Sequence, residues 1–256
     1  GMGKIFSNIP ELSSQNRRMS IPGLSAWLTT AQGRYVLDCE QTLMDAAVSD
    51  VFGFNALQLG LPQIDFLHAN RIPLRQRAGD SGPVDVLCDL DALPFAAHST
   101  DLVVLPHVLE FHHEPHQILR EIERILIPEG QLIILGFNPI SLWGLKSRVG
   151  RTGDFPWNGS YISLLRLRDW LKLLGFEVDR STFGCCVPPC NQEQWLRRWH
   201  FMEAAGERWW GLPGGIYILR AIKRVHRMRL ITPKWKTTPV GAKALRPVAQ
   251  KESNDR

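Results

Sequence analysis

Carboxylate, imidazole and amide side chains follow three apolar runs near the middle of the chain. Asp89 follows VDVLC, and His107 and Glu110 follow DLVVLP. Asn138 comes two residues after QLIILG. A carboxylate can accept a hydrogen bond from an exocyclic amine, and a histidine with a pKa near neutral can act as a general base on an acceptor hydroxyl or acidic carbon. These residues are therefore candidates for binding an amine-bearing ring and for moving a proton.

Structural explanations compete with these chemical ones. Aspartate often caps a turn, as Asp89 would here, and His107 is equally well explained as a hydrogen-bonded loop histidine. His112 and His113 crowd the same stretch. No carboxylate pair stands at a known metal-ligand spacing around them, so we expect no metal ion at this site.

The candidates follow strands in a pattern that alternates strands with helices. Strands are expected over Asn55–Leu59, Ile72–Ala78, Val84–Cys88, Asp101–Pro106, Gln131–Gly136, Phe176–Ser181 and Ile216–Ile222. Helices are expected over Gly33–Phe52, Leu61–Ala69, His116–Leu126 and Ile162–Leu174. Such alternation indicates βαβ units and a mainly parallel sheet. Ligands of such sheets bind beyond the carboxyl ends of the strands, which is where the candidates stand.

Composition sets the class of protein. The chain has 256 residues, of which 44% are hydrophobic and 21% charged, a mix that suits one sizeable core with appendages. No apolar run approaches the ~18 residues that a membrane helix needs. Five scattered cysteines argue against a disulfide framework. The cluster of Cys185, Cys186 and Cys190 fits the end of a buried strand better than a zinc site. We therefore expect a soluble, cytoplasmic protein.

Three parts are expected along the chain: an N-terminal extension over 1–33, one domain over 34–230 with a tryptophan-rich insert at 195–215, and a basic tail over 231–256. Residues 220–256 hold 11 Lys and Arg against two acids, so this end carries a formal charge of +9. Such a tail either contacts a phosphate-rich partner or is a solvated extension. The tryptophans of the insert fit either core packing or an apolar lid.

Four motifs follow one another between residues 88 and 136: DLDALPF at Asp89–Phe95, DLV at Asp101–Val103, LREIERILIPEG at Leu119–Gly130 and LIIL at Leu132–Leu135. In order and spacing this stretch resembles the class I S-adenosylmethionine (SAM) dependent methyltransferases, in the branch of the ubiquinone and menaquinone biosynthesis enzymes. The segment GFNPISLWGL that follows is similar to a bacterial methyltransferase subgroup. The resemblance implies a Rossmann-like α/β fold, with a mainly parallel seven-stranded sheet, helices on both faces and SAM as the cofactor.

The resemblance also implies roles for single residues. Asp89 and the backbone amide of Leu90 would hold the adenine ring. His107 would lie near the methionine part of SAM and near the acceptor, and the turn at Gly60 would face the cofactor. Glu110 and Asn138 are assigned to the acceptor pocket.

The first motif of the family, strand–D-x-G-x-G-x-G, is degenerate in this chain, which supplies Gln58, Gly60, Pro62 and Ile64 at its four positions. An amide replaces the acid, proline removes a backbone donor, and isoleucine adds bulk where a ligand needs room. An acid normally ends the second strand and binds the ribose, and Asp80 is the only carboxylate nearby.

Three functions compete as a result. The leading hypothesis is a SAM-dependent methyltransferase that acts on a small, hydrophobic or planar acceptor. The second is a non-catalytic relative whose cofactor site has decayed. The third is an RNA methyltransferase that uses the basic tail, although the tail holds few of the aromatic residues onto which single strands stack.

Overall fold

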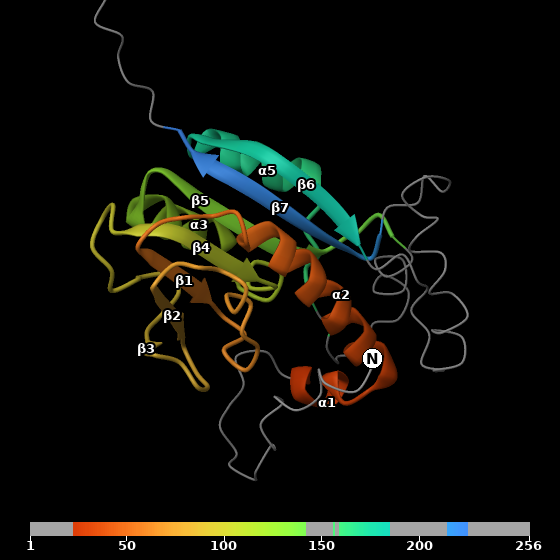
Figure 1. Cartoon of the computed structure of the whole chain (residues 1–256). Coiled ribbons are helices and arrows are strands. Elements are labelled where there is room, and N and C mark those ends of the chain that lie inside the picture. The colour runs from red at the N-terminus through yellow and green to blue at the C-terminus, as the bar shows by residue number, and fades with distance from the viewer. Residues whose placement is uncertain (1–22, 142–155, 157–158, 185–213, 225–256) are drawn as a thin grey trace, which may run out of the picture. The chain divides into compact units, whose positions relative to one another are not determined.

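The computed structural model describes residues 23–141, 156, 159–184 and 214–224. Seven strands of this part form one sheet in the order β3-β2-β1-β4-β5-β7-β6 (Figure 1). They are β1 Asn55–Leu59, β2 Leu74–Gly79, β3 Val86–Leu87, β4 Thr100–Pro106, β5 Leu126–Phe137, β6 Phe176–Gly184 and β7 Ile216–Lys223. Only β7 runs antiparallel to its neighbours, and the other pairs of this sheet are parallel. The expected seven-stranded, mainly parallel sheet is confirmed.

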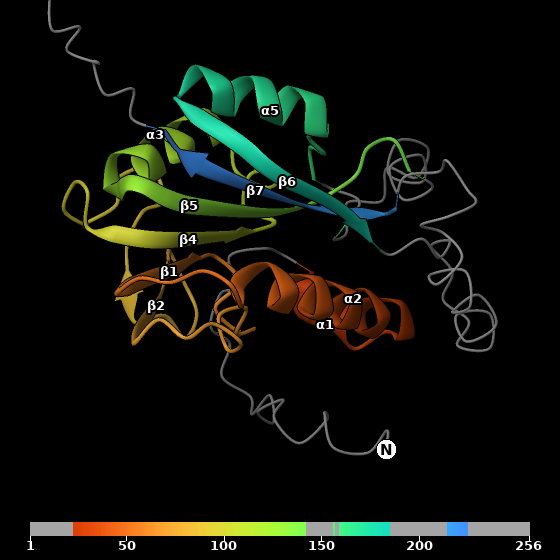
Figure 2. The same ribbon diagram turned by 45° about the horizontal axis from the view of Figure 1, so that its top comes forward.

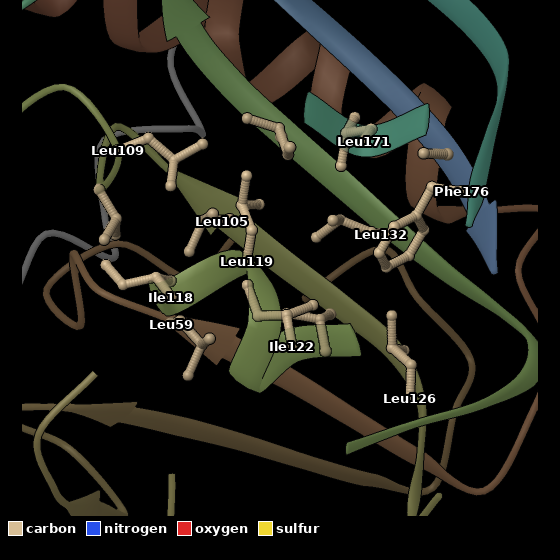
Figure 3. Close-up of a cluster of buried hydrophobic side chains, with 14 of the residues drawn as sticks. Leu59, Leu105, Leu109, Ile118, Leu119, Ile122, Leu126, Leu132, Leu171 and Phe176 are labelled. Carbon is tan, nitrogen blue, oxygen red and sulfur yellow. The ribbon is translucent and has the colours of Figure 1, made fainter. Parts of the chain in front are cut away.

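Helices cover both faces of the sheet (Figure 2). They are α1 Leu24–Leu28, α2 Ala31–Val48, α3 Pro115–Ile125 and α5 Leu164–Leu173. Side chains alternate across each strand, so β4 sends Val103 and Leu105 into the core under α3 and α5, and Leu102 and Val104 into the core under α2. Figure 3 shows the first of these cores, in which the aliphatic side chains of α3 pack on β1, β4 and β5.

Local sequence signals explain where the helices begin. The N-cap Thr30 of α2 accepts a hydrogen bond from the amide of Gly33 at 3.0 Å, and Ser163 caps α5 in the same way. Pro115 occupies the first position of α3, where no backbone donor is needed. The expected helices Gly33–Phe52, His116–Leu126 and Ile162–Leu174 are therefore confirmed with small shifts at their ends.

Helix α2 ends at Val48, four residues before the expected end at Phe52. The side-chain amide of Asn70 donates to the carbonyl oxygens of Val48 and Val51, at 2.6 and 3.0 Å. These bonds satisfy carbonyls that a longer helix would have paired with its own amides. A distant side chain thus sets this boundary, which the local sequence does not reveal.

The expected helix Leu61–Ala69 is wrong, because residues 60–73 connect β1 to β2 through turns. Parallel strands are usually joined by a helix of a dozen or more residues, so this crossover is unusually short. Leu61 has a left-handed φ of 43°, and Pro62 follows it with no backbone donor. Within the described residues the connections from β2 to β3 and from β3 to β4 also lack helices.

Several expectations fall outside the described residues. These are the cluster of Cys185, Cys186 and Cys190, the tryptophan-rich insert, most of the N-terminal extension and the basic tail. Among the helices that the structure describes, none is long and apolar enough to cross a membrane.

Candidate functional site

The carboxyl ends of the parallel strands meet at one edge of the sheet, and most of the predicted site residues follow them. Asp80 comes directly after β2, and Asp89 lies two residues after β3. His107 follows β4 and Asn138 follows β5. The topology therefore collects these residues along the edge at which open α/β sheets bind ligands.

At the β2–β3 end of this edge, polar groups are free to bind a ligand. The carboxylate of Asp89 is exposed, and no described residue bonds or pairs with it. The backbone amide of Leu90 likewise donates to no group in the described part of the chain. Among the described residues, the carboxylate of Asp80 accepts a bond only from the hydroxyl of Ser81, at 2.9 Å. Two carboxylates and one amide donor thus suit an amine-bearing ring and a pair of ribose hydroxyls.

The part of the edge at the end of β1, next to β2, is built differently, because the side chain of Gln58 turns back into the protein. Its Nε2 donates to the carbonyl oxygens of Gly60, Leu61 and Ile64, at 3.2, 3.1 and 2.8 Å. Its Oε1 accepts from the amide of Phe66 at 3.0 Å. Gln58 is fully buried. The amide that replaces the family's acid therefore holds the loop after β1 together.

Gly60 keeps the glycine conformation of the family motif but not its open space. Its φ is 79°, a left-handed value that favours glycine. A Cβ at this position would overlap Cγ2 of Val108, from the turn after β4. The polar groups at the ends of β2 and β3 suit a nucleoside such as that of SAM, whereas the space beside Gly60 at the end of β1 is taken by a side chain of the protein itself.

A buried ion cluster lies at the carboxyl end of β4. Nε2 of His107 lies 2.7 Å from Oε1 of Glu40 on α2, and Nδ1 lies 2.8 Å from Oε2 of Glu110. The other oxygen of Glu110 accepts a bond from the amide of Phe137 at the end of β5. His107, Glu40 and Glu110 are at most 4% exposed. The cluster joins α2 to the ends of two neighbouring strands.

The electrostatics of this cluster keep His107 charged. Burial alone lowers the pKa of His107, but the carboxylates of Glu40 and Glu110 outweigh it and raise that pKa to about 10. Burial raises the pKa of Glu110, opposed by the attraction of His107. At neutral pH both ring nitrogens of His107 are therefore protonated, and each donates a hydrogen bond to a glutamate side chain. This arrangement favours a structural role for His107 over the predicted role as a base.

The turn after β5 is also fixed by internal bonds. The side-chain amide of Asn138 donates to the carbonyl of Gly214 at 3.0 Å, and its oxygen accepts from the amide of Ile140. The ring of Phe137 lies between those of His107 and Tyr161, with centroids 4.3 and 5.2 Å away. Glu110 and Asn138, both predicted to face an acceptor, thus lie at the expected edge but bond to the protein.

Close packing around Glu110 requires a glycine on β5. A Cβ on Gly136 would stand 2.7 Å from the hydroxyl of Tyr217 and 3.1 Å from a carboxylate oxygen of Glu110. Burial, and then the nearby charge of Glu110, hold the pKa of Tyr217 well above its usual value. Its hydroxyl therefore stays protonated and donates to the carbonyl of Ile162 at 3.2 Å.

Sequence reasoning missed Glu40. This residue stands four positions after Val36 and four before Met44, and the structure buries all three on the same face of α2. A carboxylate on a buried helical face needs a hydrogen-bonded or charged partner. The spacing was thus a signal that Glu40 has an ionic partner, but it did not identify His107, which is 67 residues away.

Asp91, His112 and His113 bring side-chain ligand atoms within 4.8 Å of one another near the same edge. Nδ1 of His112, however, accepts a bond from the amide of Glu114 at 3.1 Å. This arrangement does not test the expected absence of a metal ion, which stays a prediction.

Comparisons with known proteins agree with this architecture. Residues 60–134 match the model of a methyltransferase domain. The uncharacterized protein YafS of Escherichia coli is 31% identical over 209 residues, which are 80% of this chain and 77% of YafS. The ubiquinone/menaquinone biosynthesis C-methyltransferase UbiE of Xanthomonas oryzae is 32% identical over 151 residues, which cover 55% of this chain and 60% of UbiE.

Solved structures share the fold at lower identity. A SAM-dependent methyltransferase from Thermotoga maritima superposes with a TM-score of 0.55 at 17% identity, covering 78% of this chain and 94% of that one. A methyltransferase in complex with the Trm112 methyltransferase activator of Haloferax volcanii gives a TM-score of 0.55 at 15% identity, covering 80% and 97%.

Proposed function

Because the chain belongs to the class I SAM-dependent methyltransferases, we propose that it transfers a methyl group from SAM to a small acceptor at the carboxyl edge of its sheet. When bound, SAM supplies a methyl group on a sulfonium centre. The protein must then align the acceptor with that group and exclude competing water. Residues at the ends of β2 and β3 would bind the cofactor, and residues at the ends of β4 and β5 would border the acceptor.

Asp89 and Leu90 would hold the adenine ring. The free carboxylate can accept from the exocyclic amine, and the free amide can donate to a ring nitrogen. Asp80, at the end of β2, is placed to accept bonds from the ribose hydroxyls. The single observation that supports the proposal is that, within the described residues, the carboxylate of Asp89 and the amide of Leu90 have no partner and that of Asp80 bonds to the adjacent Ser81 alone.

The acceptor would lie toward the ends of β4 and β5. His107, with both nitrogens bonded to carboxylates, acts there as a fixed imidazolium that orders the surrounding turns. The ring of Phe137 is fully buried and stacks on Tyr161, which is only partly buried, so Tyr161 is the ring of this pair that a planar or apolar acceptor would meet. The free charges on Asp80 and Asp89 are negative, and they disfavour the phosphates of RNA.

Calorimetric titration with SAM and with S-adenosylhomocysteine tests the proposal. Asp89→Ala removes a charged hydrogen bond worth about 1.5–3 kcal/mol, so we expect the dissociation constant to rise about 10- to 100-fold. Glu177→Ala, an exposed carboxylate on β6, is the matched control and should leave the affinity unchanged. A wild-type chain that stays silent at millimolar ligand would favour the decayed-site hypothesis instead.

The charge of +9 on residues 220–256 keeps RNA as a second candidate acceptor. Cutting the chain near Ile231 separates the two candidates. An RNA methyltransferase that uses the tail loses its RNA affinity on truncation, whereas an enzyme with a small acceptor keeps its affinity for SAM and binds RNA weakly in both forms. Filter binding with a labelled RNA at two salt concentrations measures this difference.

A further inference from the structure

The ion cluster of Glu40, His107 and Glu110 connects parts of the protein that are far apart in sequence. Glu40 lies on α2, His107 and Glu110 lie in the turn after β4, and Glu110 reaches the amide of Phe137 at the end of β5. Each of these segments borders the carboxyl edge. A change at Glu40 is therefore transmitted to the edge through His107.

The turn that His107 opens is strained and sits directly beside the cofactor region. His107 has a φ of 51°, a left-handed value that is unfavourable for a residue other than glycine. Such a conformation persists only when its surroundings enforce it. The next residue, Val108, fills the space beside Gly60. The position of Val108, and with it the wall on the methionine side, depends on how His107 is held.

We propose that Glu40 is a positioning residue for methyl transfer, which holds the turn after β4 through His107 and thereby sets the place of Val108 beside Gly60. The inference rests on the proposed function, since it assumes that this wall faces SAM. Glu40 touches neither the cofactor nor the acceptor in this account. Glu40 affects the ligand only indirectly, through its contact with the His107 imidazolium.

One substitution tests the effect of the negative charge of Glu40 without changing the shape of its side chain. Glu40→Gln keeps an oxygen that can accept from Nε2 of His107, but it removes one of the two negative charges that stabilise the imidazolium. In the part of the chain that the structure describes, the other titratable groups that act on the cluster are Glu110, in the same turn, and Tyr217 on β7, whose pKa responds to Glu110. With one carboxylate fewer, His107 loses its proton at a lower pH. The neutral ring then holds the turn after β4 less tightly from that pH upward.

The experiment measures the affinity for S-adenosylhomocysteine by calorimetry between pH 6.5 and 10.5, in wild type, Glu40→Gln and Met44→Ala. Met44 is fully buried on the same face of α2, one turn beyond Glu40, and is not part of the ion cluster. Its truncation leaves a cavity in the core and destabilises the chain without changing a charge. Chemical shifts of the His107 ring follow its protonation in the same samples.

We expect the wild-type affinity to be level to near pH 9 and then to fall. In Glu40→Gln the dissociation constant should rise about tenfold at pH 8, and the fall should begin at least one pH unit lower. Met44→Ala should keep the wild-type pH profile despite its lower stability. If Glu40→Gln does not fold, Glu110→Gln provides the same loss of charge, and the same shift is expected.

Three results would overturn the inference, and they can be told apart. A folded Glu40→Gln that binds with the wild-type affinity and pH profile refutes the role of Glu40 while leaving the proposed function intact. An identical shift in Met44→Ala shows that general destabilisation explains the effect. A wild-type chain that binds no S-adenosylhomocysteine refutes the proposed function and the inference together.

Discussion

Two neighbouring regions of the carboxyl edge differ in what their polar groups do. At the ends of β2 and β3, no described residue bonds to the carboxylate of Asp89 or to the amide of Leu90, and the carboxylate of Asp80 accepts a bond from the adjacent hydroxyl of Ser81. At the end of β1, both polar groups of the Gln58 side chain bond to the backbone of the loop that follows, and Val108 covers Gly60. The ends of β2 and β3 therefore keep polar groups that can bind a ligand, whereas the polar groups of Gln58 at the end of β1 are used in internal bonds.

This difference shows that loss of a sequence motif and loss of a site are separate events. The glycines of the first motif admit the cofactor by leaving space, so their replacement changes the shape of the site. The carboxylates and the amide at the ends of β2 and β3 would instead bind a ligand through direct hydrogen bonds, and these polar groups are still present. Variants at each end should therefore change different quantities: stability at the end of β1, and affinity at the ends of β2 and β3.

The largest effect is expected from Gln58→Ala. Removing this side chain leaves two buried carbonyls, one part-buried carbonyl and one buried amide without their partner, which lowers the free energy of unfolding by about 3 kcal/mol. Denaturant unfolding followed by circular dichroism measures the loss. Gln58→Asp, which restores the acid of the family motif, should be at least as unstable, because it removes the donors and buries a charge. A stable Gln58→Asp with improved SAM affinity would contradict the account.

Gly60→Ala should lower the stability by about 2 kcal/mol, since it combines a left-handed φ with a clash against Val108. Adding Val108→Ala removes the clash and should recover part of the loss. A double-mutant cycle on the free energy of unfolding measures this coupling. If the two changes are additive, Val108 does not fill the space beside Gly60 as described.

The ion cluster predicts a gradual dependence of stability on pH. The unfolded pKa of histidine is about 6.5, and the folded pKa of His107 is raised to about 10. The contribution of His107 is therefore complete below pH 6.5 and is lost as the pH rises toward 10. Urea unfolding at pH 7, 8.5 and 10 should give falling stability, and His107→Gln should flatten this part of the profile. An unchanged slope in that variant would contradict the prediction.

The smallest effect is expected from Asp80→Asn. This change keeps an oxygen for the ribose but removes the charge, so we expect an affinity loss of about 1 kcal/mol, or roughly fivefold, with no change in stability. Calorimetry with S-adenosylhomocysteine measures it. Ser81→Ala, which removes the one partner of Asp80 in the described structure, is the control and should leave the affinity near that of wild type.

The sequence predicted the elements that depend on local patterns and missed those that depend on distant side chains. The strand Asn55–Leu59 was predicted with its correct bounds, because alternation and a following glycine mark it locally. The helix Leu61–Ala69 was predicted wrongly, because bonds from Gln58 shape that loop and leave no periodic trace. The partnership of Glu40 with His107 joins residues 67 positions apart, so no spacing rule could identify it.

A crystal structure with S-adenosylhomocysteine tests the account most directly. We predict that the exocyclic amine of the adenine lies within hydrogen-bond distance of the Asp89 carboxylate, and that a ring nitrogen accepts from the amide of Leu90. A crystal grown with excess ligand that shows no nucleoside at the ends of β2 and β3, or one bound elsewhere, would contradict the account.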